Sequence, residues 1–416
     1  METRGRRWYF VGLVTIAIAI SYFDRQTLPV AIAAIQHNIP ISNEQFSYLQ
    51  TGFLLSYAAM YVGGGRLLDL LGTRIGFLVI MVWWSIACAL HGLANGFGLL
   101  LVARFMLGAG EGGGFPAATR VIAEWIEPAE RSTAMGLINA GTAVGSLLAP
   151  PLIGLILLHS GWRAVFVLSG ATGAAWVLWW SFSYRSNSSV ISAVGEDSGS
   201  KTSNIRWSAL LRMRNVQCFV FAKFMSDSAW YFLLFWLPKY LYDARGFDVK
   251  QVSYFAWIPY AASGLGSFLG GWFSSYLLAR GLPINLARKI ALGCCAAMMP
   301  AVMLVSLTPV SVAIALFSVA FFAQQAWSGL IMTLPADVFP LEVVGSVAGM
   351  IGFGGAIGGA IFGLVAGQLL GHGVSYGALF VAVGMFHLIG FAAIALFAGR
   401  IEPMRVAGLN HIESRA

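Results

Sequence analysis

Long apolar segments dominate this sequence and decide what it can fold into. A helix that crosses a membrane needs about 20 consecutive, mainly apolar residues. Charged residues make up 10% of the 416 residues, which is too few to cover a soluble protein, since soluble domains contain roughly 25%. The sequence therefore predicts an all-α integral membrane protein with twelve transmembrane helices. They lie at residues 8–36, 45–68, 75–94, 97–123, 132–158, 163–184, 216–242, 251–279, 287–306, 309–334, 343–370 and 375–399.

A polar interval divides these apolar segments into two groups of six. It begins at Arg185, reads RSNSSVISAVGEDSGSKTSNIR and is rich in Ser, Asn and Gly, which is typical of a flexible linker. We therefore predict an N-terminal six-helix bundle at residues 1–185, a cytoplasmic linker at 186–211 and a C-terminal six-helix bundle at 212–416.

Short motifs recur in the two predicted bundles. GGGRLLDLLGTR (63–74) has a counterpart in LGGWFSSYLLARG (269–281), and EPAERSTAMG (127–136) has one in FPLEVVGSVAG (339–349). Repeated halves with a substrate site at their interface are typical of membrane transporters.

Basic residues lie mainly on one side of the predicted membrane. If the N-terminus is cytoplasmic, the opposite side receives Arg163, Lys239, Arg245 and Lys250, and the other loop Lys and Arg residues face the cytoplasm. Because loops rich in Lys and Arg stay on the cytoplasmic side, we predict that both termini are cytoplasmic. The net charge of +8 is spread between apolar segments, so we expect a lipid bilayer and no nucleic acid as partner. The four cysteines have no metal-ligand spacing, and we expect no metal and no cofactor.

A few charged residues remain inside the predicted spans, where a charge at the bilayer centre costs at least about 2.5–3.5 kcal/mol. Arg104 and Glu111 are two helical turns apart and share one helix face, and Lys223 and Asp227 are spaced to pair on one face. After the charges at the loops and span ends are set aside, the residues that remain are Asp24, Arg25, Arg104, Glu111, Lys223 and Asp227, and we expect Arg120 and Glu124 to reach the interface.

Two interpretations of these charges stay open. In the structural one, Asp24, Arg25, Arg104 and Glu111 form an ion-pair network that holds two helices together. In the functional one, an arginine binds an anionic substrate and a carboxylate carries a coupling proton. Burial raises the pKa of a carboxylate and a neighbouring arginine lowers it, so a site that opens to water and closes again changes its affinity for a proton.

Glycines surround Glu111 in the stretch RFMLGAGEGGGFP. A phosphate-binding loop would need a Gly-Lys-Ser/Thr ending and a preceding strand, and the sequence has neither. The glycines instead predict close helix packing and bending, and Pro116 supports a local kink.

Two motifs carry a resemblance to a known family. Tyr-x-Asp-Arg, which contains Asp24 and Arg25, and Arg-Phe-x-x-Gly-x-x-Glu, from Arg104 to Glu111, resemble the anion:cation symporter family of the major facilitator superfamily. The resemblance implies that Arg25 contacts a substrate carboxylate, that Asp24 and Glu111 are protonation sites, and that Arg104 partners them. We nominate Arg104, together with Arg25, for substrate binding. It also places Tyr57 at the substrate cavity.

The loop between the second and third spans adds to the resemblance. Its pattern Gly-x-x-x-Asp-x-x-Gly-x-Arg ends at Arg74 and resembles the loop signature of the superfamily, although Leu70 stands where a basic residue commonly follows the Asp. We predict that Asp69, Arg74 and Arg131 form a cytoplasmic latch that favours one conformation, and a simple solvated turn is the alternative.

Longer stretches, such as KFMSDSAWYFLLFWLPKYL from Lys223, resemble the bacterial hexuronate transporters within that family. The resemblance implies proton-coupled uptake of a sugar acid by a functional monomer in the bacterial inner membrane. Galactonate, glucarate or another carboxylate stays open as the substrate. A sugar acid also needs hydrogen-bonding and aromatic contacts, for which we nominate Asn139, Thr142, Trp230, Tyr231, Gln324, Gln325 and Ser328.

Three other classes are less consistent with the sequence. A channel would show rings of like charge or filter repeats, and an enzyme would show a nucleophile–base set or a metal-ligand cluster. A proton-coupled drug exporter would place acids without arginines inside the spans, whereas here each N-terminal acid has an arginine nearby. We expect a transporter and not an enzyme.

Overall fold

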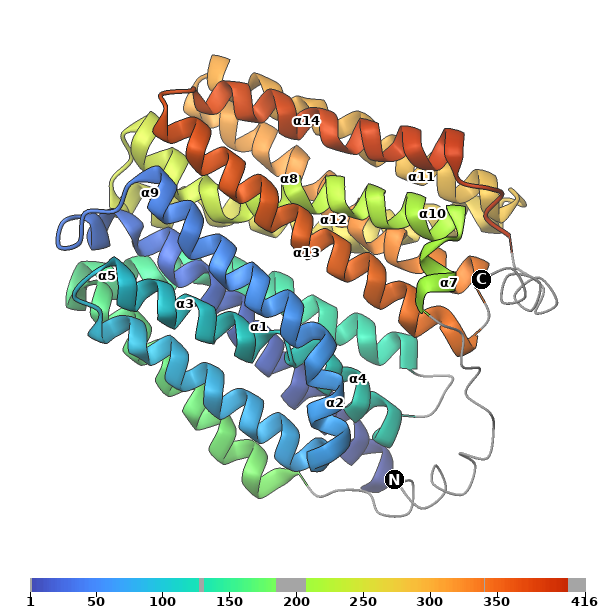
Figure 1. Ribbon diagram of the computed structural model, residues 1–416, viewed down its shortest axis with the longest axis horizontal. Helices are drawn as coiled ribbons and strands as arrows, with labels where there is room; N and C mark the ends of the chain where they lie inside the picture. The colour runs from blue at the N-terminus through green and yellow to red at the C-terminus, as the bar shows by residue number, and fades with distance from the viewer. Residues whose placement is uncertain (1, 127–130, 185–206, 340, 403–416) are drawn as a thin grey trace. The chain divides into compact units, whose positions relative to one another are not determined.

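The computed structural model describes residues 2–126, 131–184, 207–339 and 341–402, and its regular elements in those ranges are helices (Figure 1). The predicted all-α fold is confirmed for this part of the chain. Unit 1 comprises the described residues within Met1–Gly199, Leu234–Trp257 and Gly363–Gly373, and unit 2 those within Ser200–Leu233, Ile258–Phe362 and Val374–Ala416.

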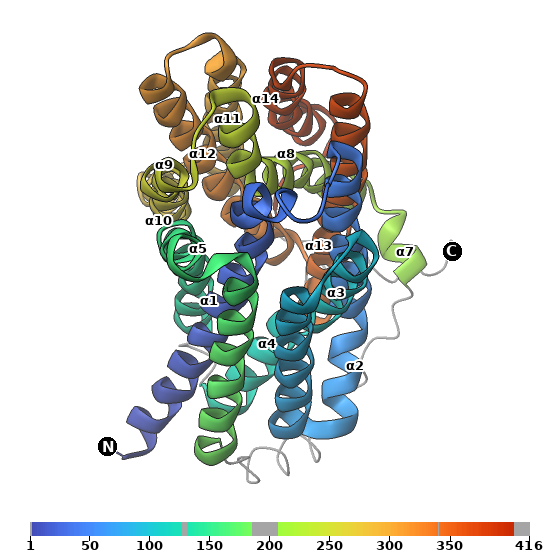
Figure 2. The same ribbon diagram turned by 90° about the vertical axis from the view of Figure 1, so that its left-hand side faces the viewer.

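Unit 1 contains the N-terminal helices and short parts of later ones. Its helix α1 packs along α5, and α2 packs along α3 (Figure 2). The elements that begin in this unit are α1 (Glu2–Gln36), α2 (Asn43–Leu90), η1 (His91–Leu93), α3 (Phe97–Glu111), α4 (Gly114–Trp125), α5 (Arg131–Ser183), α9 (Val249–Phe255) and the first residue of α10 (Trp257–Ala279).

Unit 2 contains most of the C-terminal helices. Helix α8 belongs to this unit up to Leu233 and α13 up to Phe362. The remaining elements are α7 (Trp207–Leu211), α8 (Arg214–Arg245), α11 (Ile284–Met298), η3 (Met299–Leu307), α12 (Val310–Val338), α13 (Leu341–Gly371), α14 (Tyr376–Ala392) and η4 (Ala393–Phe397).

Two glycines interrupt the longest helices. Gly72 in α2 has φ 73° and Gly161 in α5 has φ 77°, a left-handed conformation that glycine adopts without steric cost. Each break lies between two predicted spans, so α2 and α5 each consist of two helices. The helical stretch is interrupted at Gly112 and Gly113, between the end of α3 and the start of α4, whereas Pro116 lies in the first turn of α4 and a kink there stays a prediction.

Seven helical stretches among the described residues are long and apolar enough to cross a membrane. The number twelve therefore stays a prediction, and α1 shows one reason: Asp24 and Arg25 reduce its apolar character. The seven stretches are Leu70–Leu93, Ala134–Ser183, Arg214–Arg245, Ile284–Leu307, Val310–Pro335, Val347–Gly371 and Tyr376–Phe397.

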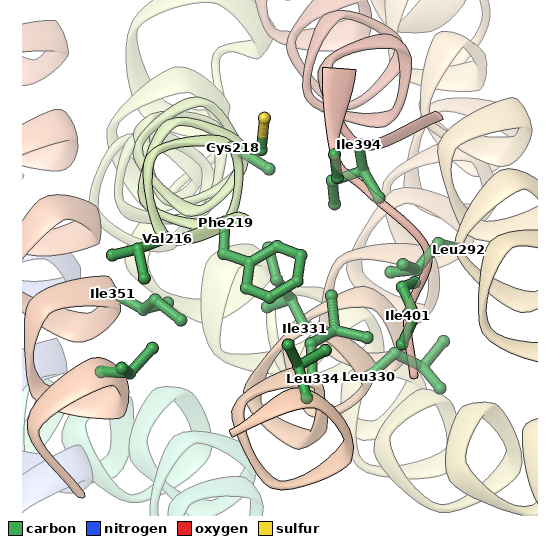
Figure 3. Close-up of a cluster of buried hydrophobic side chains, with 14 of the residues drawn as sticks. Val216, Cys218, Phe219, Leu292, Leu330, Ile331, Leu334, Ile351, Ile394 and Ile401 are labelled. Carbon is green, nitrogen blue, oxygen red and sulfur yellow. The ribbon is translucent and has the colours of Figure 1, made fainter. Parts of the chain in front are cut away.

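A continuous apolar cluster forms the core of unit 2. Figure 3 shows the Phe219 ring of α8 beside Ile331 and Leu334 of α12, with Ile351 of α13 and Ile394 nearby. These side chains come from helices far apart in the sequence, and all five are buried. Because lipid tails are as apolar as these side chains, the close van der Waals packing between them, rather than removal from water, holds such helices together in a membrane.

Glycine contacts bring α3 close to α2 in unit 1. A Cβ atom on Gly108 would overlap the carbonyl oxygen of Phe53 and Oγ of Ser56, and one on Gly110 would overlap Trp84. The close packing predicted from the glycines is therefore confirmed at these positions. It brings α3 near enough to α2 for their polar side chains to meet.

We expect Gly108→Ala to destabilise the protein by about 1–3 kcal/mol, the usual cost of overpacking. The backbone of α2 must move away, because the new methyl group would meet a main-chain carbonyl. Thermal unfolding of purified protein in detergent measures the effect. Gly98→Ala is the matched control, because a Cβ atom at Gly98 on the same helix has no neighbour within 4 Å. Equal melting temperatures for the two variants would contradict the packing account.

Candidate functional site

An ion pair between α1 and α3 forms the centre of the candidate site in unit 1. Nε of Arg25 donates a hydrogen bond of 2.7 Å to Oε2 of Glu111. The Ser21 hydroxyl donates a second one, also 2.7 Å, to the same oxygen. Ser21 lies one turn before Arg25 on α1, so the two donors share a helix face. Arg25 and Glu111 are each 1% exposed.

Aromatic rings surround the Arg25 guanidinium. Its Cζ atom lies 4.2 Å from the ring centroid of Tyr22, 4.6 Å from that of Tyr57 and 5.6 Å from that of Phe53. Aromatic faces attract cations more strongly when water is excluded. Tyr57, nominated for the substrate cavity, therefore lies directly beside the predicted anion-binding arginine.

Glu111 keeps unused hydrogen-bonding capacity. Its Oε2 accepts both hydrogen bonds, whereas Oε1 has no hydrogen-bond partner among the described residues. Glu111 is also the last residue of α3, directly before the break at Gly112. The carboxylate therefore lies at the junction of α3 and α4, which begins at Gly114.

Asp24 has different partners from its neighbour in sequence. Nε1 of Trp84 in α2 donates to its Oδ2 at 3.1 Å, and the Ser169 hydroxyl in α5 donates to its Oδ1. Asp24 is fully buried and forms no ion pair among the described residues. From the sequence we expect each acid of the N-terminal spans to have an arginine nearby. Glu111 forms an ion pair with an arginine, whereas Asp24 forms none among the described residues. Adjacent residues on a helix point about 100° apart, which is why Asp24 and Arg25 face different helices.

Arg104 is buried, and no carboxylate of the described residues forms an ion pair with it. Its Nη2 donates a hydrogen bond of 2.5 Å to Oε1 of Gln50, and its Cζ lies 4.9 Å from the Phe53 ring centroid. Its Nε and Nη1 atoms have no hydrogen-bond partner among the described residues. Arg104 and Glu111 share a helix but form no ion pair in this part of the structure.

A second buried ion pair lies in unit 2. Nζ of Lys223 is 2.9 Å from Oδ1 of Asp227, as their spacing predicts, and donates a hydrogen bond of 2.8 Å to Ser328 in α12. Gln324, one turn before Ser328, lies beside the Asp227 carboxylate. Trp230 packs edge-on against Phe321, with 5.6 Å between ring centroids.

Asn139, Thr142 and Gln325 join neither ion pair through a contact among the described residues. The Thr142 hydroxyl donates to the carbonyl oxygen of Asn139, and Asn139 is exposed on α5. Gln325 is half-buried next to Gln324. Tyr231 lies one turn after Asp227, and a Cβ atom on Gly359 of α13 would overlap its ring.

The latch is only partly described. Nη2 of Arg74 donates to the carbonyl oxygen of Ser181 at 3.0 Å, and the Arg74 carbonyl accepts from Trp180 at 3.1 Å. These bonds join the loop at Gly72 to the end of α5. The side chains of Asp69 and Arg131 lie outside the described part of the structure.

Four hydrogen-bond partners of these charged groups in unit 1 were not nominated from the sequence: Ser21, Gln50, Trp84 and Ser169. Gln50 could have been predicted from the sequence, because an amide inside an apolar segment needs a polar partner. The sequence indicates Ser21 less strongly, through its position one helical turn before Arg25. Trp84 and Ser169 contact Asp24 across long sequence separations, and neither residue type marks such a contact. No group of three potential metal ligands lies together among the residues described.

Comparisons with known proteins agree in family and fold. The family described as Major Facilitator Superfamily matches residues 14–363. A hexuronate transporter of Escherichia coli (strain K12) is 30% identical over 425 residues, covering 99% of this chain and 98% of the relative. A galacturonate transporter of Dickeya chrysanthemi is 32% identical, with 70% and 91% covered. The crystal structure of a D-xylose-proton symporter has a TM-score of 0.74 at 14% identity, with 95% and 98% covered, and bears on the fold alone.

Proposed function

Since this chain belongs to the Major Facilitator Superfamily, we propose that it takes up a sugar acid together with protons by alternating access. The family membership agrees with the predicted resemblance. The two relatives are named as transporters, and the expectation that the chain is not an enzyme is confirmed. The nature of the substrate, the proton coupling and the direction of transport are the parts that we propose.

The observation that carries the proposal is the ion pair between Arg25 and Glu111, at 2.7 Å. A guanidinium that neutralises Glu111 cannot fully neutralise a substrate carboxylate at the same time. When Glu111 takes up a proton, its negative charge is removed and Arg25 becomes available for the substrate anion. Substrate and proton then bind together, because each removes the obstacle to the other.

Asp24 is proposed as a second protonation site. Its carboxylate is buried against an indole N–H and a serine hydroxyl and has no ion pair among the described residues. A buried carboxylate without a cation is costly when ionised. This cost is the reason for proposing that Asp24 exchanges a proton during the transport cycle.

A hexuronate such as galacturonate or glucuronate is the proposed substrate. Two relatives named for hexuronate and galacturonate support this choice. The nominated residues Tyr57, Trp230, Tyr231, Gln324, Gln325, Ser328, Asn139 and Thr142 are proposed to contact its hydroxyl groups and ring. Arg104 is proposed to tune the charge balance around Glu111.

The membrane topology is part of the proposal. We propose twelve transmembrane helices with both termini in the cytoplasm, in a monomer of the bacterial inner membrane. The breaks at Gly72 and Gly161, which divide α2 and α5, support this number. Asp69, Arg74 and Arg131 are proposed to form the cytoplasmic latch.

A ligand screen tests the substrate class. A ligand that binds the folded state raises the melting temperature with concentration. We expect galacturonate or glucuronate to stabilise the purified protein, and galactonate, glucarate and cationic drugs to stabilise it less. Stabilisation by cationic drugs and by no sugar acid would favour an exporter and contradict the proposal.

A further inference from the structure

Four polar side chains from two helices meet in unit 2. Lys223 and Asp227 are one turn apart on α8, and Gln324 and Ser328 are one turn apart on α12. Nζ of Lys223 lies between them, 2.9 Å from Oδ1 of Asp227 and 2.8 Å from Oγ of Ser328. We call these four residues the α8–α12 cluster.

Helix α13 approaches the cluster with glycine. A Cβ atom on Gly355 would overlap Oδ2 of Asp227, and one on Gly359 would overlap the Tyr231 ring. At these two positions α13 therefore brings its backbone close without adding a side chain. The hydrogen-bonding capacity around Asp227 is left to the residues of α8 and α12.

The cluster has hydrogen-bonding capacity that its own members do not use. Gln324 is 1% exposed and its amide lies beside the Asp227 carboxylate, but its Oε1 accepts no hydrogen bond among the described residues, and Oδ1 of Asp227 accepts none beyond the ion pair. An ammonium group has three N–H donors, two of which Lys223 directs at Asp227 and Ser328. Lys223 and Asp227 are buried but keep small exposed fractions of 7% and 6%. Buried polar groups in proteins normally have partners, and hydroxyl groups of a ligand would supply them here.

The charges of the cluster restrict the ligand further. Lys223 and Asp227 cancel, so the cluster offers donors and acceptors but no net charge. A hydroxyl group fits this environment, whereas a carboxylate would meet the charge of Asp227 with no free cation to balance it. Galacturonate and galactarate differ at one carbon. In galacturonate this carbon carries a hydroxyl group in the ring form or is an aldehyde in the open form, and in galactarate it is a carboxylate.

We propose that the α8–α12 cluster binds hydroxyl groups of the sugar acid and, through the charge balance of Lys223 and Asp227, rejects acids with a second carboxylate. The inference rests on the proposed function and adds to it a determinant of specificity. It assigns the chain to acids with one carboxylate, the uronates, over those with two, the aldarates.

Asp227→Asn tests the proposal as a gain of function. The variant leaves the Lys223 ammonium without its counter-charge, and the second carboxylate of galactarate restores an ion pair there. Calorimetry on the full-length protein in detergent gives the affinities for galacturonate and galactarate. We expect wild type to favour galacturonate by about tenfold or more, and the variant to shift the ratio toward galactarate by about tenfold. An unchanged ratio, or a wild type that binds both acids equally, overturns the proposal.

Asp243→Asn is the matched control. Lys239 and Asp243 form another Lys–Asp pair with the same spacing on α8, at 2.6 Å, with 3% and 32% of their side chains exposed. Loss of that pair should leave the ratio of affinities unchanged. A shift as large as that of Asp227→Asn would show a general effect of charge and overturn the proposal.

The double variant Lys223→Gln/Asp227→Asn covers the case in which Asp227→Asn does not fold. It removes both charges, so the ratio of affinities should equal that of wild type, while galacturonate binds about tenfold more weakly through lost charged hydrogen bonds. Unchanged galacturonate affinity would show that the pair only joins helices and would overturn the proposal. If wild type binds no sugar acid at all, the proposed function itself has failed, and this outcome is distinct from an unchanged ratio.

Discussion

Arg25→Ala should abolish measurable binding of galacturonate, with a loss of at least about 30-fold in affinity. Truncating one partner of a buried, hydrogen-bonded charge pair costs about 2 kcal/mol or more. Here the lost guanidinium is the group proposed to hold the substrate carboxylate. It is also the group that Tyr22 and Tyr57 orient, with its Cζ 4.2 and 4.6 Å from their ring centroids. Calorimetric titration of the purified variant measures the loss.

Two further variants separate binding from folding. Arg163→Ala removes an exposed arginine that donates to the Ala94 carbonyl and Asn95, and it should bind galacturonate as wild type does. Arg25→Lys keeps the charge but loses the planar fork of donors, so an intermediate affinity is expected. Normal binding by Arg25→Ala together with lost binding by Arg104→Ala would transfer the role to Arg104, whose Nε and Nη1 have no hydrogen-bond partner among the described residues.

Glu111→Gln should remove proton-driven accumulation and leave exchange of substrate across the membrane. Glutamine keeps the shape and a carbonyl acceptor for the 2.7 Å hydrogen bonds from Arg25 and Ser21, but it cannot bind or release a proton. The site therefore holds substrate without coupling it to the gradient. Uptake and counterflow in proteoliposomes, measured on the same preparation, report the two properties separately.

Glu402→Gln is the control for this prediction, because Glu402 is an exposed carboxylate whose loss should leave both activities intact. A Glu111→Gln variant that still concentrates substrate against its gradient would exclude Glu111 as the coupling residue. Asp24, which is also buried in unit 1, would then be the candidate coupling residue. Loss of both accumulation and counterflow would indicate that Glu111 is needed for binding rather than for coupling.

The helices of this chain are largely predictable because apolar length in a membrane protein is a local property of the sequence. The breaks at Gly72 and Gly161 fall between predicted spans for the same reason. The break after Glu111 follows from a run of glycines that packs against α2. None of these inferences requires knowledge of which helices are neighbours.

The pairing of the charged groups is less predictable. The sequence identifies Asp24, Arg25, Arg104 and Glu111 as costly groups inside spans, but it does not fix which acid meets which base. In the structure Arg25 pairs with Glu111, whereas Asp24 is held by Trp84 and Ser169. These contacts depend on helix rotation and on residues distant in the sequence. The Lys223–Asp227 pair is the exception, because its spacing on one helix is enough to predict it.

Uptake of labelled galacturonate into proteoliposomes, with and without an inward proton gradient, tests the central claim most directly. Because Glu111 and the substrate compete for Arg25, we expect galacturonate to accumulate above its external concentration when the gradient is present. The accumulated galacturonate should be lost when a proton carrier dissipates the gradient. Equal uptake with and without the gradient, or no uptake of any sugar acid, would contradict the account.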